Sequence, residues 1–158
     1  MIEATADATL PVSAREAFAV VSDIGNADWL PAVRGVRHIG GPKTGVGARY
    51  EVEAGLVGRH LRGVLRVVEA TSPSYLELQL EEGLDLTIII EVETVRKGCE
   101  LTVTARYAVS GVLGAAVERA SQPAARREAA RAVEQLAAHF AEPPKKSASR
   151  PAKRPARG

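Results

Sequence analysis

The sequence predicts an α+β fold in which a curved antiparallel sheet of seven strands wraps around one long C-terminal helix. Residues 2–10 alternate apolar and polar side chains, as a half-buried strand does. An alanine-rich helix is predicted over residues 111–142. Between them, turn signals of Gly, Pro and Ser separate most of the further strand-like runs, which are 33–39, 47–54, 59–70, 75–81, 85–95 and 99–109. Such a layout encloses a pocket between sheet and helix.

The segment after the first strand is predicted to be helical. Ser13 and Glu16 form a capping-box pattern at the start of a helix over about 14–22. A second short helix is expected over 26–30, since the following proline disfavours its continuation. The glycine-rich stretch 40–47 lacks Walker spacing and a following helix, so we interpret it as a loop and not as a phosphate-binding site.

Alternation also divides the strands into two faces. One face carries Arg, Glu and Thr and is expected to meet water, with opposite charges pairing across strands. The other is apolar apart from two tyrosines, contains several small residues and is expected to meet the core. Its members are Ala48, Tyr50, Val52, Leu61, Gly63, Leu65, Val67, Leu76, Leu78, Leu80, Leu86, Ile88, Ile90, Val92, Leu101, Val103, Ala105 and Tyr107.

Pro123 lies inside the long helix, so a kink or break is expected near Ser121. The segment 126–131 is strongly helical and is expected to be charged on its outer side. The apolar positions of the helix are Val112, Leu113, Ala116, Val117, Ala120, Ala124, Ala130, Val133, Leu136, Ala137 and Phe140.

Length and charge predict one domain, residues 1–142, followed by a disordered tail, 143–158. Six of the 21 Lys and Arg residues lie in the tail, which has no acid and a charge of +6, while the body has a charge of −4. One cysteine, Cys99, makes no disulfide or metal site, and no cofactor or metal is expected. No signal peptide and no run of ~18 apolar residues is present, so we expect a cytoplasmic protein, a monomer or weak dimer.

Several short motifs follow one another in a fixed order along residues 1–141: they are 11–18, 21–23, 29–31, 45–47 and 63–69. In this order they resemble the START-like, Bet v 1-like (SRPBCC) superfamily, and most of all its bacterial polyketide cyclase/dehydratase and lipid-transport branch. The resemblance implies a helix-grip fold, in which the sheet grips the C-terminal helix and two short helices close one end. Members bind lipids, sterols, quinones or polyketides, or activate chaperones, so fold alone does not define function.

The predicted site is the cavity between sheet and helix. The resemblance places Trp29 near the cavity mouth, and alternation points Tyr50 and Tyr107 inward, although a purely structural role is open for all three. Asp23 and Asp28 are interpreted as helix caps, and His38, His60 and His139 have no metal-binding spacing. The predicted ligand-binding residues are Trp29, Tyr50, Leu78, Ile88, Ile90, Val103, Tyr107, Leu113 and Val117, and no catalytic residue is assigned.

Three functions are open. The first is binding of a hydrophobic small molecule such as a lipid, quinone or polyketide-like compound, which the aliphatic inward face favours. The second is a cyclase- or dehydratase-type enzyme that uses the tyrosines as proton donors in the same cavity. The third is an interaction module whose basic tail makes weak contact with a polyanion such as nucleic acid or an anionic membrane.

Removal of residues 143–158 is expected to leave the melting temperature and the binding of an apolar probe unchanged, because the tail has no apolar periodicity. Retention on heparin at low salt should fall, since six positive charges are lost. The measurement compares the full chain with a chain that ends at Glu142. A melting temperature several degrees lower in the shortened chain would show that the tail belongs to the fold.

Overall fold

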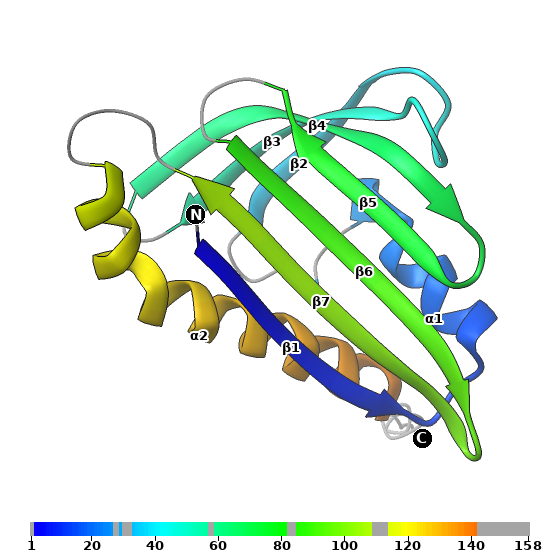
Figure 1. Ribbon diagram of the computed structural model, residues 1–158. Helices are drawn as coiled ribbons and strands as arrows, with labels where there is room; N and C mark the ends of the chain where they lie inside the picture. The colour runs from blue at the N-terminus through cyan, green and yellow to red at the C-terminus, as the bar shows by residue number, and fades with distance from the viewer. Residues whose placement is uncertain are drawn as a thin grey trace, which may run out of the picture.

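The computed structural model describes residues 2–26, 29, 33–56, 59–81, 85–108 and 114–141. They form one seven-stranded sheet and a long C-terminal helix, which confirms the predicted α+β class (Figure 1). The predicted tail, 143–158, lies outside the described residues. In chain order the elements are β1 (Ile2–Leu10), α1 (Ala14–Val21), the 3-10 helix η1 (Ile24–Asn26), β2 (Val33–Gly40), β3 (Arg49–Leu56), β4 (Arg59–Thr71), β5 (Tyr75–Leu80), β6 (Asp85–Val95), β7 (Gly98–Ala108) and α2 (Gly114–Ala141).

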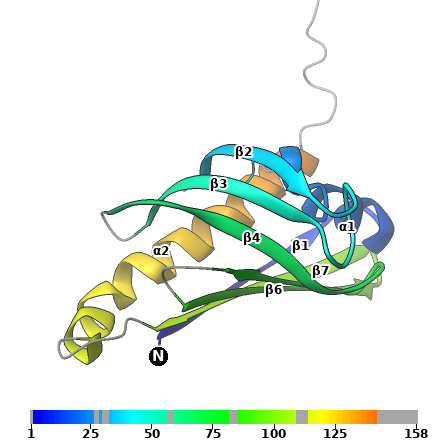
Figure 2. The same cartoon turned by 90° about the horizontal axis from the view of Figure 1, so that it is seen from above.

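The strands follow the order β1-β7-β6-β5-β4-β3-β2, and all neighbouring pairs are antiparallel. Strands β2 to β7 therefore form a meander, whereas β1 pairs with the last strand, so that β1 and β2 are the two edges of the sheet. That register runs from Ile2 opposite Tyr107 to Leu10 opposite Cys99. Figure 2 shows the sheet strongly curved, with α2 running along its concave side, where the helix packs mainly on β1 and β7.

The face predicted to be apolar meets the core. Tyr50, Leu78, Ile90 and Leu101 are all at most 2% exposed. In β4 the alternation is interrupted by a shift of register between Val67 and Glu69. A bulge of this kind turns the next side chain to the other face. As a result Glu69 is exposed, and Ala70 packs against the core in its place.

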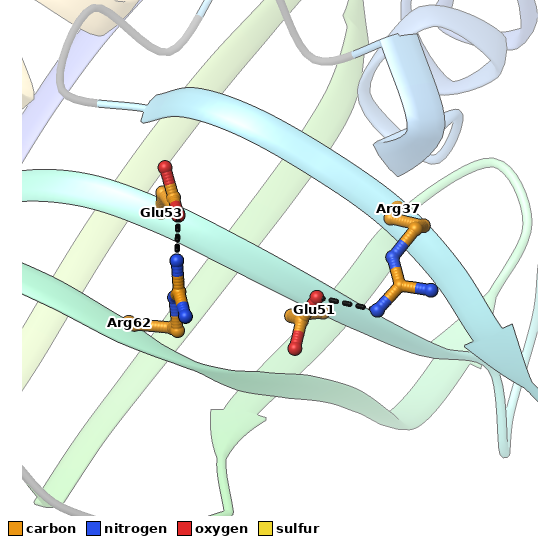
Figure 3. A network of polar contacts seen from close by, with 4 residues as sticks. All are labelled: Arg37, Glu51, Glu53 and Arg62. Carbon is orange, nitrogen blue, oxygen red and sulfur yellow. Dashed lines mark hydrogen bonds and ion pairs between the residues drawn. The ribbon is translucent and has the colours of Figure 1, made fainter.

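The opposite face is a grid of exposed ion pairs, as predicted. Figure 3 shows two of them across β2, β3 and β4: Arg37 donates to Glu51 over 2.7 Å, and Arg62 donates to Glu53. The hydrogen bond from Arg62, and next its charge, lower the pKa of Glu53. Exposed pairs of this kind stabilise a fold only slightly. Further pairs among the described residues are Arg49 with Glu81 at 2.8 Å, Arg66 with the same carboxylate at 3.9 Å, and Arg106 with Glu3 at 2.6 Å.

The first helix begins as predicted, and a short 3-10 turn follows it. The Ser13 hydroxyl accepts a hydrogen bond from the Glu16 amide over 3.1 Å and so caps α1. The next turn, η1, ends at Asn26, where a helix was predicted to begin. Asn26 is bonded to a residue that precedes it in the chain: its amide side chain donates to the Asp23 carboxylate over 3.0 Å. Of the predicted helix 26–30, only Asn26 and Trp29 are described.

The glycine-rich stretch is the loop between β2 and β3. Gly41 has a φ of +69°, and a Cβ there would come within 2.1 Å of the Gly47 carbonyl oxygen, so only glycine fits. Two side chains hold this loop: Nε2 of His38 lies 3.1 Å from the Gly41 carbonyl, and the Tyr50 hydroxyl donates to the Lys43 carbonyl. The loop therefore has a structural reason for its glycines.

Of the kink or break predicted near Ser121, the break does not occur: α2 continues through Pro123 from Gly114 to Ala141. A proline removes one helical hydrogen bond, but α2 packs on β1 and β7, and this packing holds the helix in place. The first turns of α2 run at an angle to the rest (Figure 1). Among the α2 side chains that the structure describes, the buried ones are Ala125, Ala129, Ala132, Val133 and Leu136, while Ala124 and Ala130 are only partly buried.

We expect Ile90→Lys to unfold the protein and Glu91→Lys to leave it folded. Ile90 is 0% exposed, so its replacement buries an unpaired ammonium group, whereas Glu91 lies on the solvent face of the same strand. The surface change should alter the free energy of unfolding by less than ~0.5 kcal/mol. Thermal melting of both variants checks this. Similar melting temperatures would mean that the two faces of β6 are assigned the wrong way round.

Candidate ligand-binding cavity

A cavity of about 130 Å³ lies between the concave face of the sheet and α2. Its described wall is almost entirely apolar: among the lining residues that the structure describes, only Arg62, Tyr107 and Glu128 have polar side chains. The apolar lining residues are Val33, Val52, Ala54, Gly63, Leu65, Leu80, Leu86, Ile88, Val103, Ala105, Ala125, Ala129 and Ala132.

Small residues on both walls create this space. On α2, Ala125, Ala129 and Ala132 follow one another at helical spacing and so share one face of the helix. The sheet contributes Gly63, where an added Cβ would come within 2.8 Å of the Leu80 side chain. Leucine can therefore lie over the glycine and form part of the wall. Larger side chains at these positions would fill the space between sheet and helix.

Three of the predicted ligand-binding residues line the cavity: Ile88, Val103 and Tyr107. They lie on neighbouring strands, β6 and β7, on the face that period two indicates. Leu113 lies outside the described residues, as does the side chain of Val117. The other four predicted residues are buried in the core and are not among the residues that line the cavity: Trp29, Tyr50, Leu78 and Ile90. Their role in ligand binding remains a prediction.

Tyr50 has a contact of its own. Its hydroxyl donates to the Lys43 carbonyl, and its ring lies edge-on to that of His38 with 5.4 Å between ring centroids. Burial, followed by the charge of Asp23, raises the pKa of Tyr50. His38 is exposed and its Nε2 faces the carbonyls of the glycine-rich loop. This pair thus stabilises the loop between β2 and β3.

Glu128 is the polar group that sequence reasoning missed. We expected the charges of 126–131 on the outer side of the helix, but Glu128 lies with Ala125, Ala129 and Ala132 on the face that borders the cavity. The signal was present in the sequence, because positions 125, 128, 129 and 132 form one helical stripe. We did not recognise it because a glutamate with arginines on both sides in the sequence is usually a surface residue.

Arg62 borders the cavity differently. Its side chain is 66% exposed and its guanidinium donates to Glu53, as Figure 3 shows, so its charge is engaged on the solvent face. Glu128 and Tyr107 therefore bring the polar side-chain chemistry to the described part of the wall. Within the described residues, no group of three or more His, Cys, Asp and Glu side chains is placed to hold a metal ion. No described helix is long and apolar enough to cross a membrane.

A curved sheet, a long C-terminal helix and an apolar cavity between them define the class as a helix-grip protein. Residues 1–141 match the family described as "Polyketide cyclase / dehydrase and lipid transport", and the chain belongs to this family. This confirms the resemblance found in the sequence. Comparison with curated proteins gives no match.

Solved structures support the same fold. TTHA0849 from Thermus thermophilus has a TM-score of 0.75 at 14% identity, covering 93% of this chain and 99% of that one. A START superfamily protein from Mycobacterium smegmatis has a TM-score of 0.68 at 12% identity, covering 87% and 96%. The di-domain ARO/CYC BexL of the BE-7585A biosynthetic pathway has a TM-score of 0.62 at 18% identity, covering 90% of this chain and 47% of BexL.

We expect Ala105→Leu to weaken the binding of a small apolar probe such as 2-methylnaphthalene by about tenfold. Ala105 lines the cavity, so the larger side chain takes up space that the probe needs. Thr102→Leu is the control, since it adds bulk to the other face of the same strand. Calorimetric titration of the two variants gives the comparison, and unchanged affinity in Ala105→Leu would mean that the probe binds elsewhere.

Proposed function

We propose that this protein binds a hydrophobic small molecule, of lipid, quinone or polyketide-like type, in the cavity between the sheet and α2. The observation that carries the proposal is the cavity wall, in which thirteen of the sixteen described lining residues are apolar. Removal of apolar surface from water supplies ~25 cal/mol per Å² of affinity to such a ligand. Membership of a family that includes lipid transport in its description supports the same function.

An enzymatic function of the cyclase or dehydratase type in the same cavity is the second candidate. The observation in its favour is that Tyr107 and Glu128, a phenol and a carboxylate, both border the cavity. Proton transfer requires a group of this kind close to the reacting atoms. The similarity in fold to BexL, an ARO/CYC protein, supports this candidate at the level of fold only.

Native mass spectrometry of the full chain, purified from its own host, tests binding directly. We expect a co-purified apolar compound that is lost on denaturation. Ala105→Leu should carry less of it than the wild type, because the cavity is smaller, and Thr102→Leu should carry the same amount. An empty wild-type protein that also fails to bind added 2-methylnaphthalene would contradict the proposal.

The same preparation separates the two candidates. If the compound is recovered unchanged after long incubation with the protein, the binding function is favoured. If a poly-β-ketone substrate is cyclised or dehydrated, and the rate falls in Tyr107→Phe, the enzyme is favoured. The third function, contact of the tail with a polyanion, stays a prediction of the sequence, since residues 143–158 lie outside the described part.

A further inference from the structure

Glu128 is the acidic residue on a helix face otherwise formed by alanines. It lies one turn from Ala125 and from Ala132, and all of them border the cavity. The side chain is 26% exposed, which places it between the cavity and the surface. A carboxylate in this position lies next to any molecule that occupies the cavity.

The two oxygens of Glu128 have different surroundings. Oε2 lies 3.4 Å from Nη1 of Arg131, an exposed residue one turn further along α2. Oε1 is buried, and none of the described residues donates a hydrogen bond to it. A buried acceptor without a donor costs free energy, and a partner that supplies the donor removes that cost.

We propose that Glu128 selects the ligand: its Oε1 accepts a hydrogen bond from a hydroxyl group on an otherwise apolar molecule. The inference rests on the proposed function and narrows it. Phenols, hydroquinones and hydroxylated lipids supply the donor, whereas pure hydrocarbons do not. A ligand that ends in a carboxylate is disfavoured, because two like charges would meet in surroundings poor in water.

The apolar wall and the glutamate have separate roles in this arrangement. The wall supplies affinity to any apolar body that fits, and Glu128 discriminates between ligands by their polar end. Discrimination through one buried polar group is efficient, because the wrong ligand leaves that group without a partner.

Three probes of one shape test the inference by calorimetric titration of the full chain: 2-naphthol, 2-methylnaphthalene and 2-naphthoate. We expect 2-naphthol to bind about tenfold more tightly than 2-methylnaphthalene. A hydrogen bond to a carboxylate typically improves affinity by about this factor. The carboxylate probe should bind most weakly. Equal affinity for naphthol and methylnaphthalene would overturn the inference and leave the proposed function intact, whereas no binding of any probe would overturn both.

Variants of α2 locate the effect. Glu128→Leu should abolish the preference for 2-naphthol, and Glu128→Gln, which keeps the shape of the side chain, should reduce it and improve the binding of 2-naphthoate. Glu134→Leu is the matched control, because Glu134 is exposed on the same helix and does not border the cavity. Thermal melting establishes that each variant is folded. If either folded Glu128 variant retains the full wild-type preference, Glu128 is not the selecting residue.

Discussion

The pairing of β1 with β7 is the interaction on which the rest of the structure depends. It joins the first residues of the chain to a strand about one hundred positions later, with Ile2 opposite Tyr107. The two strands together form the surface on which α2 packs. Gln122 of α2 donates to the backbone of Glu3, and Arg106 of β7 pairs with the same residue. The cavity exists because packing on β1 and β7 holds α2 at one side of the curved sheet, away from the other strands.

A cavity in a protein core has an energetic cost, because the atoms around it lack contacts that tight packing would supply. Here the small residues occur on both walls, with Ala125, Ala129 and Ala132 on the helix and Gly63 and Ala105 on the sheet. Larger side chains at these positions would offset the cost and remove the space. The main core around Leu78, Ile90 and Leu101 is by contrast formed by large side chains that are almost completely buried. The molecule thus combines a region of large buried side chains with a hollow one.

Local chemistry in the sequence predicted most of the fold. The alternation of apolar and polar residues assigned the side chains of each strand to two faces, because successive side chains of a strand point in opposite directions. Ser13 marked the start of α1, because a hydroxyl at that position caps the first turn. Where the sequence left a choice, a distant contact decided it. Whether Pro123 would kink or break the long helix depends on packing against β1 and β7, and α2 continues as one helix from Gly114 to Ala141.

The sequence by itself determined the fold class, the inward and outward faces of the strands and the aliphatic character of the pocket, since each follows from periodicity and side-chain type. It also placed Ile88, Val103 and Tyr107 on the face that borders the cavity. Only the tertiary structure decided which inward residues meet the space and which meet one another. That choice depends on where α2 crosses the sheet and how it is rotated about its axis. Helical spacing puts Glu128 on one stripe with Ala125, Ala129 and Ala132, but only the rotation of α2 turns that stripe toward the cavity.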